Sequence, residues 1–126
     1  MRDFEYEAPS NLSDALAVFA NHNGSARALA GGTDLIDHVR TGLLQPDVIV
    51  DIKKIPELNV LDISDNGLRL GAAVPCSDIY ENQGIDTAYT ALTDSCRIIG
   101  GVQIQNRASV GGNLCNSGPA ADAIPA

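Results

Sequence analysis

The chain has 126 residues, of which 44% are hydrophobic and 19% are charged, so it fits one globular domain with a modest core. The net charge of -8 argues against nucleic acid and against an anionic membrane surface as binding partners. It still permits one bound phosphate group, because backbone N–H groups can hold an anion without any net charge. Aromatic residues make up only 4%, so aliphatic side chains must build the core.

The N-terminal start and the cysteines favour a cytoplasmic protein. The acidic start lacks the apolar region of a signal peptide, and no apolar run in the sequence reaches membrane-spanning length. The cysteines are odd in number and form no CxxC pair, which is typical of reduced thiols: Cys76, Cys96 and Cys115.

The first part of the chain alternates strand and helix patterns. Apolar residues recur at helical spacing from Leu12 to Ala20, with Ser10 or Asn11 as N-cap and Asn23-Gly24 as the stop. The β-α-β-α-β order favours a small sheet with parallel pairing and crossover helices, and residues 1–56 are predicted to form one subdomain. The predicted elements are a strand over residues 4–7, a helix over 12–20, a strand over 26–30, a helix over 34–41 that Gly42 ends, and a buried strand over 47–52.

The second part, residues 57–126, has a different pattern and is predicted to begin a second subdomain. Asp65-Asn66-Gly67 separates two apolar runs, which predicts a β-hairpin. A helix is predicted over residues 86–99, with Leu92, Cys96 and Ile99 on one face. The predicted fold class is therefore α+β. The apolar end of the chain indicates that the second subdomain is incomplete.

A first candidate site is the segment Leu29–Leu35, with the sequence Leu-Ala-Gly-Gly-Thr-Asp-Leu, between a predicted strand and a predicted helix. Glycine lets a ligand approach the backbone closely, and a helix that follows such a turn points free N–H groups toward it. These features are typical of pyrophosphate binding. A plain tight turn with Thr33 or Asp34 as N-cap is the alternative, and this segment alone does not decide between them.

A second candidate site is the segment Arg107–Asn116, which again contains two adjacent glycines with hydroxyl and amide groups beside them. Asn113 and Asn116 can donate and accept hydrogen bonds, as a ribityl chain or a phosphate requires. Taken alone, the pattern also fits an ordinary Gly-Gly-Asn turn between strands.

Together the two segments resemble the FAD-binding (medium) subunit of the xanthine dehydrogenase family of molybdenum hydroxylases, which includes the CO dehydrogenase flavoproteins. Members pair an Ala-Gly-Gly-Thr-Asp-like loop with a later Ser/Thr-x-Gly-Gly-Asn loop, and here Gly111 follows Gly31 by 80 positions. The resemblance extends through the segments 47–52, 68–72, 101–107 and 118–122. It implies a PCMH-type FAD-binding fold of two subdomains, of which this chain is the N-terminal part.

The resemblance also implies the cofactor and its contacts. The two glycine segments would hold the pyrophosphate and adenosine of FAD, Ile99 would line the flavin, and Asp122 would contact the cofactor beyond the second segment. Gly118 departs from the serine or threonine often found there and is not counted. The implied FAD-binding residues are Arg27, Ala28, Leu29, Ala30, Gly31, Gly32, Thr33, Asp34, Ile99, Ser109, Val110, Gly111, Gly112, Asn113 and Asp122.

The implied activity is that of an FAD-dependent oxidoreductase subunit. Electrons would pass from [2Fe–2S] clusters in a small partner subunit through FAD to NAD⁺ or another acceptor, while a large partner subunit would carry molybdopterin. The alternatives are a stand-alone flavin oxidase or dehydrogenase of the same fold, and a non-catalytic nucleotide-binding assembly module. Because the flavin supplies the chemistry, no catalytic residue is expected in this chain.

The remaining polar residues give weaker signals. His22 and His38 have no second ligand at metal-binding spacing, so surface or cap roles are expected and no metal site is predicted. Cys115 lies close to the second segment, and a small packing residue is the favoured interpretation for it.

Overall fold

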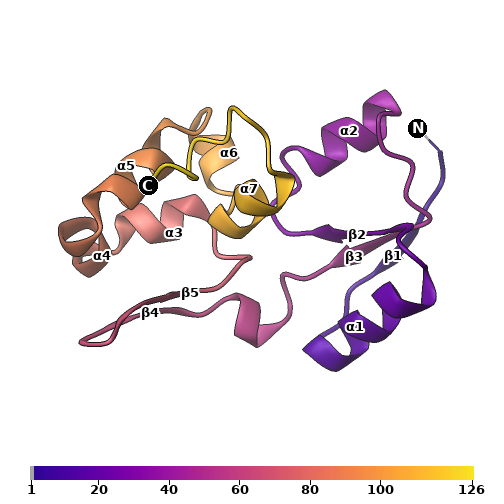
Figure 1. Ribbon diagram of the computed structural model, residues 1–126, viewed down its shortest axis with the longest axis horizontal. Coiled ribbons are helices and arrows are strands. Elements are labelled where there is room, and N and C mark those ends of the chain that lie inside the picture. Colours follow the sequence, from indigo (N-terminus) through magenta and orange to yellow (C-terminus); the bar gives the residue numbers. More distant parts are fainter. Residues whose placement is uncertain (1) are drawn as a thin grey trace.

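The computed structural model describes residues 2–126, so Met1, the first residue of the predicted first subdomain, lies outside the described residues (Figure 1). A three-stranded parallel sheet with the order β1-β3-β2 forms near the N-terminus. Its strands are β1 (Glu5–Glu7), β2 (Ala26–Leu29) and β3 (Val48–Asp51). Parallel pairing and crossover connections agree with the expected β-α-β-α-β order.

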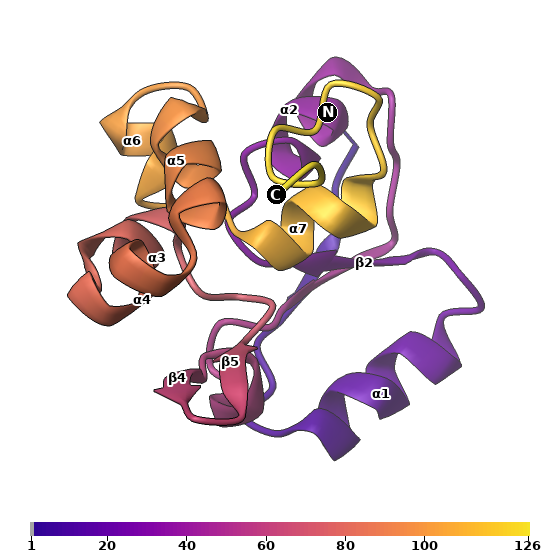
Figure 2. The ribbon, with the colours of Figure 1, turned by 60° about the vertical axis from the view of Figure 1, so that its left-hand side comes forward.

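The helices α1 (Leu12–Asn21) and α2 (Leu35–Thr41) cover opposite faces of this sheet (Figures 1 and 2). Successive side chains of a strand point to opposite faces, and β3 is buried on both. Val48 and Val50 pack with Ala15 of α1, whereas Ile49 packs with Val39 of α2. The central strand therefore carries an unbroken apolar run, as a strand covered on both faces should.

Local signals set the ends of these elements. The Asn11 side chain caps α1 by accepting a hydrogen bond from the Asp14 backbone N–H at 2.9 Å. Gly42 ends α2 in the left-handed conformation, with φ of 81°. Both roles were predicted, because a short polar side chain and a glycine meet the needs of the two kinds of helix end.

The rest of the chain forms a hairpin and a group of short helices (Figure 1). The predicted hairpin is present, with Ser64 paired to Gly67 across the Asp65-Asn66 turn. The helices surround a core that contains Ile79, Ile85 and Cys96. The elements are a 3-10 turn (Pro56–Leu58), β4 (Leu61–Ser64), β5 (Gly67–Leu70), α3 (Cys76–Glu81), α4 (Gln83–Ala88), α5 (Thr90–Ile98), α6 (Val102–Gln105) and α7 (Val110–Asn116).

The single helix predicted over residues 86–99 is wrong. The chain leaves the helical conformation at Tyr89, where φ is -131° and ψ is 51°, so α4 and α5 are separate helices. Ile85 from α4 and Cys96 from α5 both enter the same core. The predicted face of Leu92, Cys96 and Ile99 does contact this core.

The predicted boundary at residue 56 stays a prediction. Two small cores lie on the two faces of the N-terminal sheet, and a third lies among the helices that follow the hairpin. Between residues 2 and 126, no helix has the length and apolar character needed to cross a membrane.

Candidate functional site

The first glycine segment leaves the carboxyl end of β2 and leads into α2. The Ile52 backbone N–H donates to the Leu29 carbonyl at 3.1 Å, which fixes where the segment begins. Gly32 adopts a left-handed φ of 79°, a conformation that suits glycine. Asp34 is the N-cap of α2, although its side chain makes no capping hydrogen bond there.

The second glycine segment is helical, which corrects the expectation of a loop or turn. Ser109 is the N-cap of α7, and its hydroxyl oxygen accepts a hydrogen bond from the Gly112 backbone N–H at 3.0 Å. The two glycines form the first turn of that helix. Helix formation follows from the serine cap, which offsets the low helix propensity of glycine.

The first glycine of each pair lies against another part of the backbone. A Cβ atom on Gly31 would lie 1.8 Å from the Arg107 carbonyl oxygen, and one on Gly111 would lie 2.6 Å from the Ala72 Cα. Segments distant in sequence can therefore meet only because these positions lack a side chain. A Cβ atom on Gly112 would meet only the Ser109 hydroxyl oxygen, at 3.0 Å.

These contacts place both glycine segments around one cleft of about 740 Å³. Figures 1 and 2 show α7 beside the segment that follows β2. Ala30 and Ile52, which follow β2 and β3, both line the cleft, so it opens at the carboxyl end of the parallel sheet. Ligands of open α/β sheets bind at this end.

All but two of the predicted site residues line this cleft. Leu29 faces the core with Val39 and Ile49, and Val110 packs against the core of the second part. Ile99 and Asp122 line the cleft together with the two glycine segments. The predicted residues on the cleft are Arg27, Ala28, Ala30, Gly31, Gly32, Thr33, Asp34, Ile99, Ser109, Gly111, Gly112, Asn113 and Asp122.

The cleft also has residues that are not among the implied FAD-binding residues, although Leu35, Ala108 and Asn116 lie in the two candidate segments. Ile104 and Ala108 lie within or beside the quoted 101–107 segment, so the resemblance offered a signal for them. Ile52, Ala72 and residues 118–121 also lie in segments that carry the resemblance, whereas Leu44 lies in no such segment. These further lining residues are Leu35, His38, Leu44, Ile52, Ala72, Ile104, Ala108, Cys115, Asn116, Gly118, Pro119, Ala120 and Ala121.

The polar lining of the cleft combines neutral and charged side chains. The Arg27 guanidinium donates to the backbone carbonyls of Gly24 at 2.6 Å and Ala26 at 2.8 Å. The Asn116 amide donates to the Asp34 carboxylate at 3.3 Å and so links the two segments. Hydroxyl, amide and backbone groups are thus the main donors available to an anion.

The Asn113 side chain holds the end of the chain against α7. Its amide oxygen accepts a hydrogen bond from the Ala123 backbone N–H at 3.1 Å. Ala123 is buried, and its neighbour Asp122 lies on the cleft. The bond therefore keeps residues 118–122 along one side of the cleft.

A buried carboxylate anchors the other side. Asp51, only 6% exposed, accepts hydrogen bonds from the Tyr6 hydroxyl, from the Lys53 backbone N–H at 3.0 Å and from the Lys53 ammonium at 2.8 Å. Burial raises the pKa of Asp51, but the bonds from Lys53 and Tyr6 outweigh burial and hold it below its ordinary value. The bond to Asp51 raises the pKa of Tyr6, with burial and the carboxylate charge adding to the rise. The network fixes the end of β3, just before Ile52.

The remaining histidines and cysteines occupy different settings. The backbone of His22 caps α1, and His38 lies on the cleft. Cys115 is exposed on the cleft, so the interpretation as a packing residue is wrong for it. Cys76 and Cys96 are buried free thiols. Among residues 2–126, no three side chains of metal-binding type come together.

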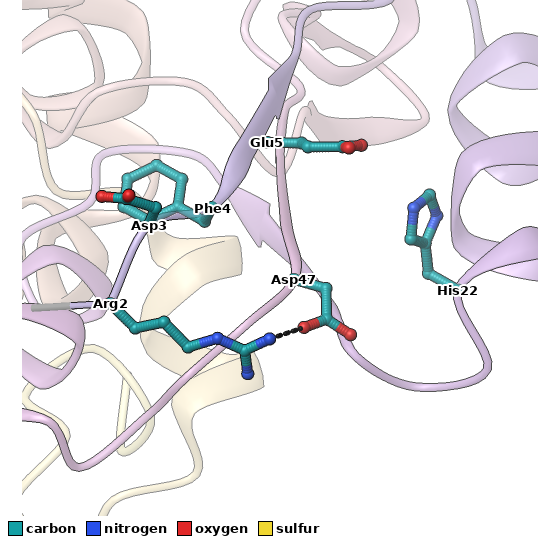
Figure 3. A pocket seen from close by; sticks show the side chains of 6 residues that line it. All are labelled: Arg2, Asp3, Phe4, Glu5, His22 and Asp47. Carbon is teal, nitrogen blue, oxygen red and sulfur yellow. Dashed lines mark ion pairs between the residues drawn. The ribbon is translucent and has the colours of Figure 1, made fainter.

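A smaller pocket of about 380 Å³ lies at the amino end of the same sheet (Figure 3). An ion pair between Arg2 and Asp47, at 3.0 Å, crosses it. Glu5 and His22 lie on its other side. Its one arginine is already paired with Asp47, and the amino end is the less usual place for a ligand in such a sheet. The larger cleft is therefore the better candidate site.

The fold and the cleft define an α+β protein with a ligand-sized site at the carboxyl end of a parallel sheet. Residues 2–126 match the family of FAD binding domains in molybdopterin dehydrogenase. Because this match covers nearly the whole chain, the protein belongs to that family.

Several curated relatives match the chain closely in sequence. The nicotinate dehydrogenase FAD-subunit of Eubacterium barkeri is 34% identical over 127 residues, which cover 100% of this chain and 43% of that subunit. The glyceraldehyde dehydrogenase medium chain of Sulfolobus acidocaldarius is 35% identical over 120 residues, which cover 95% of this chain and 42% of that protein. The chain thus spans less than half the length of these relatives.

The solved structures agree with the α+β fold. The reconstituted CO dehydrogenase from Oligotropha carboxidovorans superposes with a TM-score of 0.92 at 26% identity, covering 97% of this chain and 43% of that one. CO dehydrogenase from Hydrogenophaga pseudoflava gives a TM-score of 0.85 at 27% identity, covering 90% and 39%. The predicted PCMH-type architecture is confirmed for this part of the protein.

Proposed function

We propose that the cleft binds FAD and that both glycine segments contact its pyrophosphate. The observation that carries this proposal is their convergence: two segments 80 positions apart in sequence line one cleft of about 740 Å³. Such a volume lies in the usual range for cofactor sites, which is roughly 300–1,000 Å³. Membership of the FAD binding domain family supports the same ligand.

The residues present fit this cofactor. Gly112 leaves the cleft side of α7 open for a close ligand, and Ser109, Asn113 and Thr33 supply neutral polar groups around it. Neutral donors can hold the spread charge of a pyrophosphate without a cluster of cations. Ile99 and Ile104 form an apolar wall against which the flavin ring can lie.

The relatives support a proposal for the wider role. When bound, FAD accepts electrons and passes them on, while the chain binds, orients and shields it. We propose that the complete protein is the FAD-binding subunit of a cytoplasmic molybdenum hydroxylase. It receives electrons from a small [2Fe–2S] subunit and delivers them to NAD⁺ or another acceptor. A large molybdopterin-binding subunit would act on the substrate, with a xanthine-like compound as one candidate.

Flavin content of the full-length protein tests the proposal. We expect stoichiometric flavin absorbance that bleaches on reduction. Replacing Gly112 with Val fills the open side of α7 and should lower FAD affinity by more than about tenfold, the effect of a lost 1.4 kcal/mol. Absence of flavin from a folded wild-type protein would overturn the proposed function.

A matched control separates the cleft from the helix. Leu114 is on the same helix, is 59% exposed and does not line the cleft. Leu114→Val also places a valine in α7, but away from the cleft, so FAD affinity should stay unchanged. Equal FAD stoichiometry in Gly112→Val and wild type would contradict the assignment. Co-purification with molybdenum and iron–sulfur subunits would distinguish a molybdenum hydroxylase from a stand-alone flavoenzyme.

A further inference from the structure

Gln105 is a buried polar side chain outside the predicted site. It is 7% exposed, and hydrogen bonds engage both ends of its amide. The amide nitrogen donates to the Arg97 backbone carbonyl at 2.7 Å, and the amide oxygen accepts from the Tyr80 hydroxyl at 3.1 Å. One side chain therefore joins α3, α5 and α6. Such a buried amide is costly to leave unpaired, so its bonds strongly constrain the three helices.

The bond to Arg97 controls how α5 ends. The carbonyls of the last turn have no partner within a helix, and Arg97 belongs to that turn because α5 ends at Ile98. The chain then turns at Gly100, which has a positive φ of 52°. Between these two points lies Ile99, part of the apolar wall of the cleft. Gln105 thus holds the Arg97 carbonyl, which lies shortly before Ile99 in the chain.

Gln105 is also tied to the opposite side of the cleft. One turn of chain follows it, in which the Ala108 backbone N–H donates to the Ile104 carbonyl at 2.7 Å. The Ala108 carbonyl accepts from the Cys76 backbone N–H at 2.8 Å, and Ser109 then begins α7. The short stretch of chain from Gln105 to Ser109, fixed by these two hydrogen bonds, therefore connects Gln105 with the polar lining formed by residues 109–113.

We propose that Gln105 is a positioning residue that sets the apolar wall of the cleft at a fixed place relative to its polar lining. It has no contact with the ligand space, and it acts through the Arg97 carbonyl on one side and the turn to Ser109 on the other. This role rests on the proposed function: by placing the apolar wall, Gln105 orients the flavin ring relative to the pyrophosphate. ADP, which lacks the flavin, depends on the polar lining alone.

The experiment compares FAD with ADP on the full-length protein. In Gln105→Leu, a side chain of similar size can no longer hold Arg97 and Tyr80. FAD affinity should fall by about tenfold, as expected when a buried hydrogen-bonding group is left unpaired, and ADP affinity should stay within about twofold. The absorption and circular dichroism bands of bound flavin should also shift. A purely structural role would lower both affinities by the same factor.

Two further variants keep the test decisive. Gln103 is exposed on the same helix and does not line the cleft, so Gln103→Leu should leave both affinities unchanged. Tyr80→Phe removes one bond to Gln105 and keeps the ring, so it should shift the FAD-to-ADP ratio in the same direction by a smaller factor. If Gln105→Leu does not fold, this second variant decides the question.

The outcomes separate the two proposals. Wild-type protein that binds neither FAD nor ADP would overturn the proposed function and, with it, the role of Gln105. Wild-type protein that binds both, with an unchanged FAD-to-ADP ratio in the folded Gln105→Leu and Tyr80→Phe variants, would overturn the positioning role alone.

Discussion

The Gly31-Gly32 and Gly111-Gly112 pairs lie on one cleft, yet their backbones differ. The first pair is an irregular turn with a left-handed residue, and the second is the first turn of a helix. In both pairs the first glycine permits close packing against another segment, and both glycines line the cleft. A repeated Gly-Gly pattern therefore combines two needs, close chain contact and an open ligand surface, which mutations can separate.

The largest expected effect comes from breaking the chain contact at Gly31. Gly31→Ala should destabilise the protein by about 3 kcal/mol, because its Cβ would lie 1.8 Å from the Arg107 carbonyl oxygen and the segments must move apart. Urea unfolding measures the loss. Gly118→Ala is the matched control, since its Cβ would have its nearest contact at 3.8 Å. Equal stability of the two variants would refute the packing role of Gly31.

A middle-sized effect should follow from removing the cap of the second segment. Ser109→Ala should cost about 1 kcal/mol of stability and weaken FAD binding, because the Gly112 N–H loses its acceptor. Asn11→Ala removes an equivalent cap from α1, far from the cleft. It should cause a similar stability loss without any change in FAD titrations. A matching loss of FAD affinity in both variants would show that general destabilisation explains the effect.

The smallest expected effect is a difference in how the two sides of the cleft respond to low pH, because they are anchored by different groups. Charged Asp51 holds the strand end beside the first segment, whereas neutral Ser109 and Asn113 hold the second. Because the folded pKa of Asp51 is lowered, its contribution is present above the unfolded value and is lost as pH falls below about 4. Hydrogen exchange should therefore show residues 29–34 losing protection in acid before residues 109–116.

Asp51→Asn should remove that pH dependence, and Asp47→Asn provides the comparison. Asp47 pairs with Arg2 on the surface, where an ion pair contributes little. Loss of protection at the same pH in wild type and Asp51→Asn would exclude Asp51 as the cause.

Local signals were enough to predict the N-terminal sheet and the hairpin. The spacing of apolar residues and the stops at Asn23-Gly24 and Gly42 act over a few residues, so the sequence displays them directly. The break at Tyr89 and the short helix α3 were not predictable in this way. Each depends on which side chains share the core around Ile79, and a helix of six residues shows too little periodicity.

The cleft was predicted mainly by family resemblance, and its geometry needed the structure. Motifs indicated the two glycine segments, Ile99 and Asp122. Leu44 lines the same space although it lies in no motif, because the chain returns to the cleft after α2. The role of Gln105 was equally hidden, because it depends on partners in α3 and α5.

The close approach between Gly31 and the Arg107 carbonyl has a consequence for the order of folding. The sheet, including β3, is complete by residue 51, whereas the partner of Gly31 arrives much later in the chain. Closing such a long loop carries an entropic penalty, and contacts between distant residues form slowly. During synthesis at the ribosome, the sheet can therefore form before the cofactor cleft exists. Flavin uptake is expected to follow the emergence of α7, after the sheet has formed.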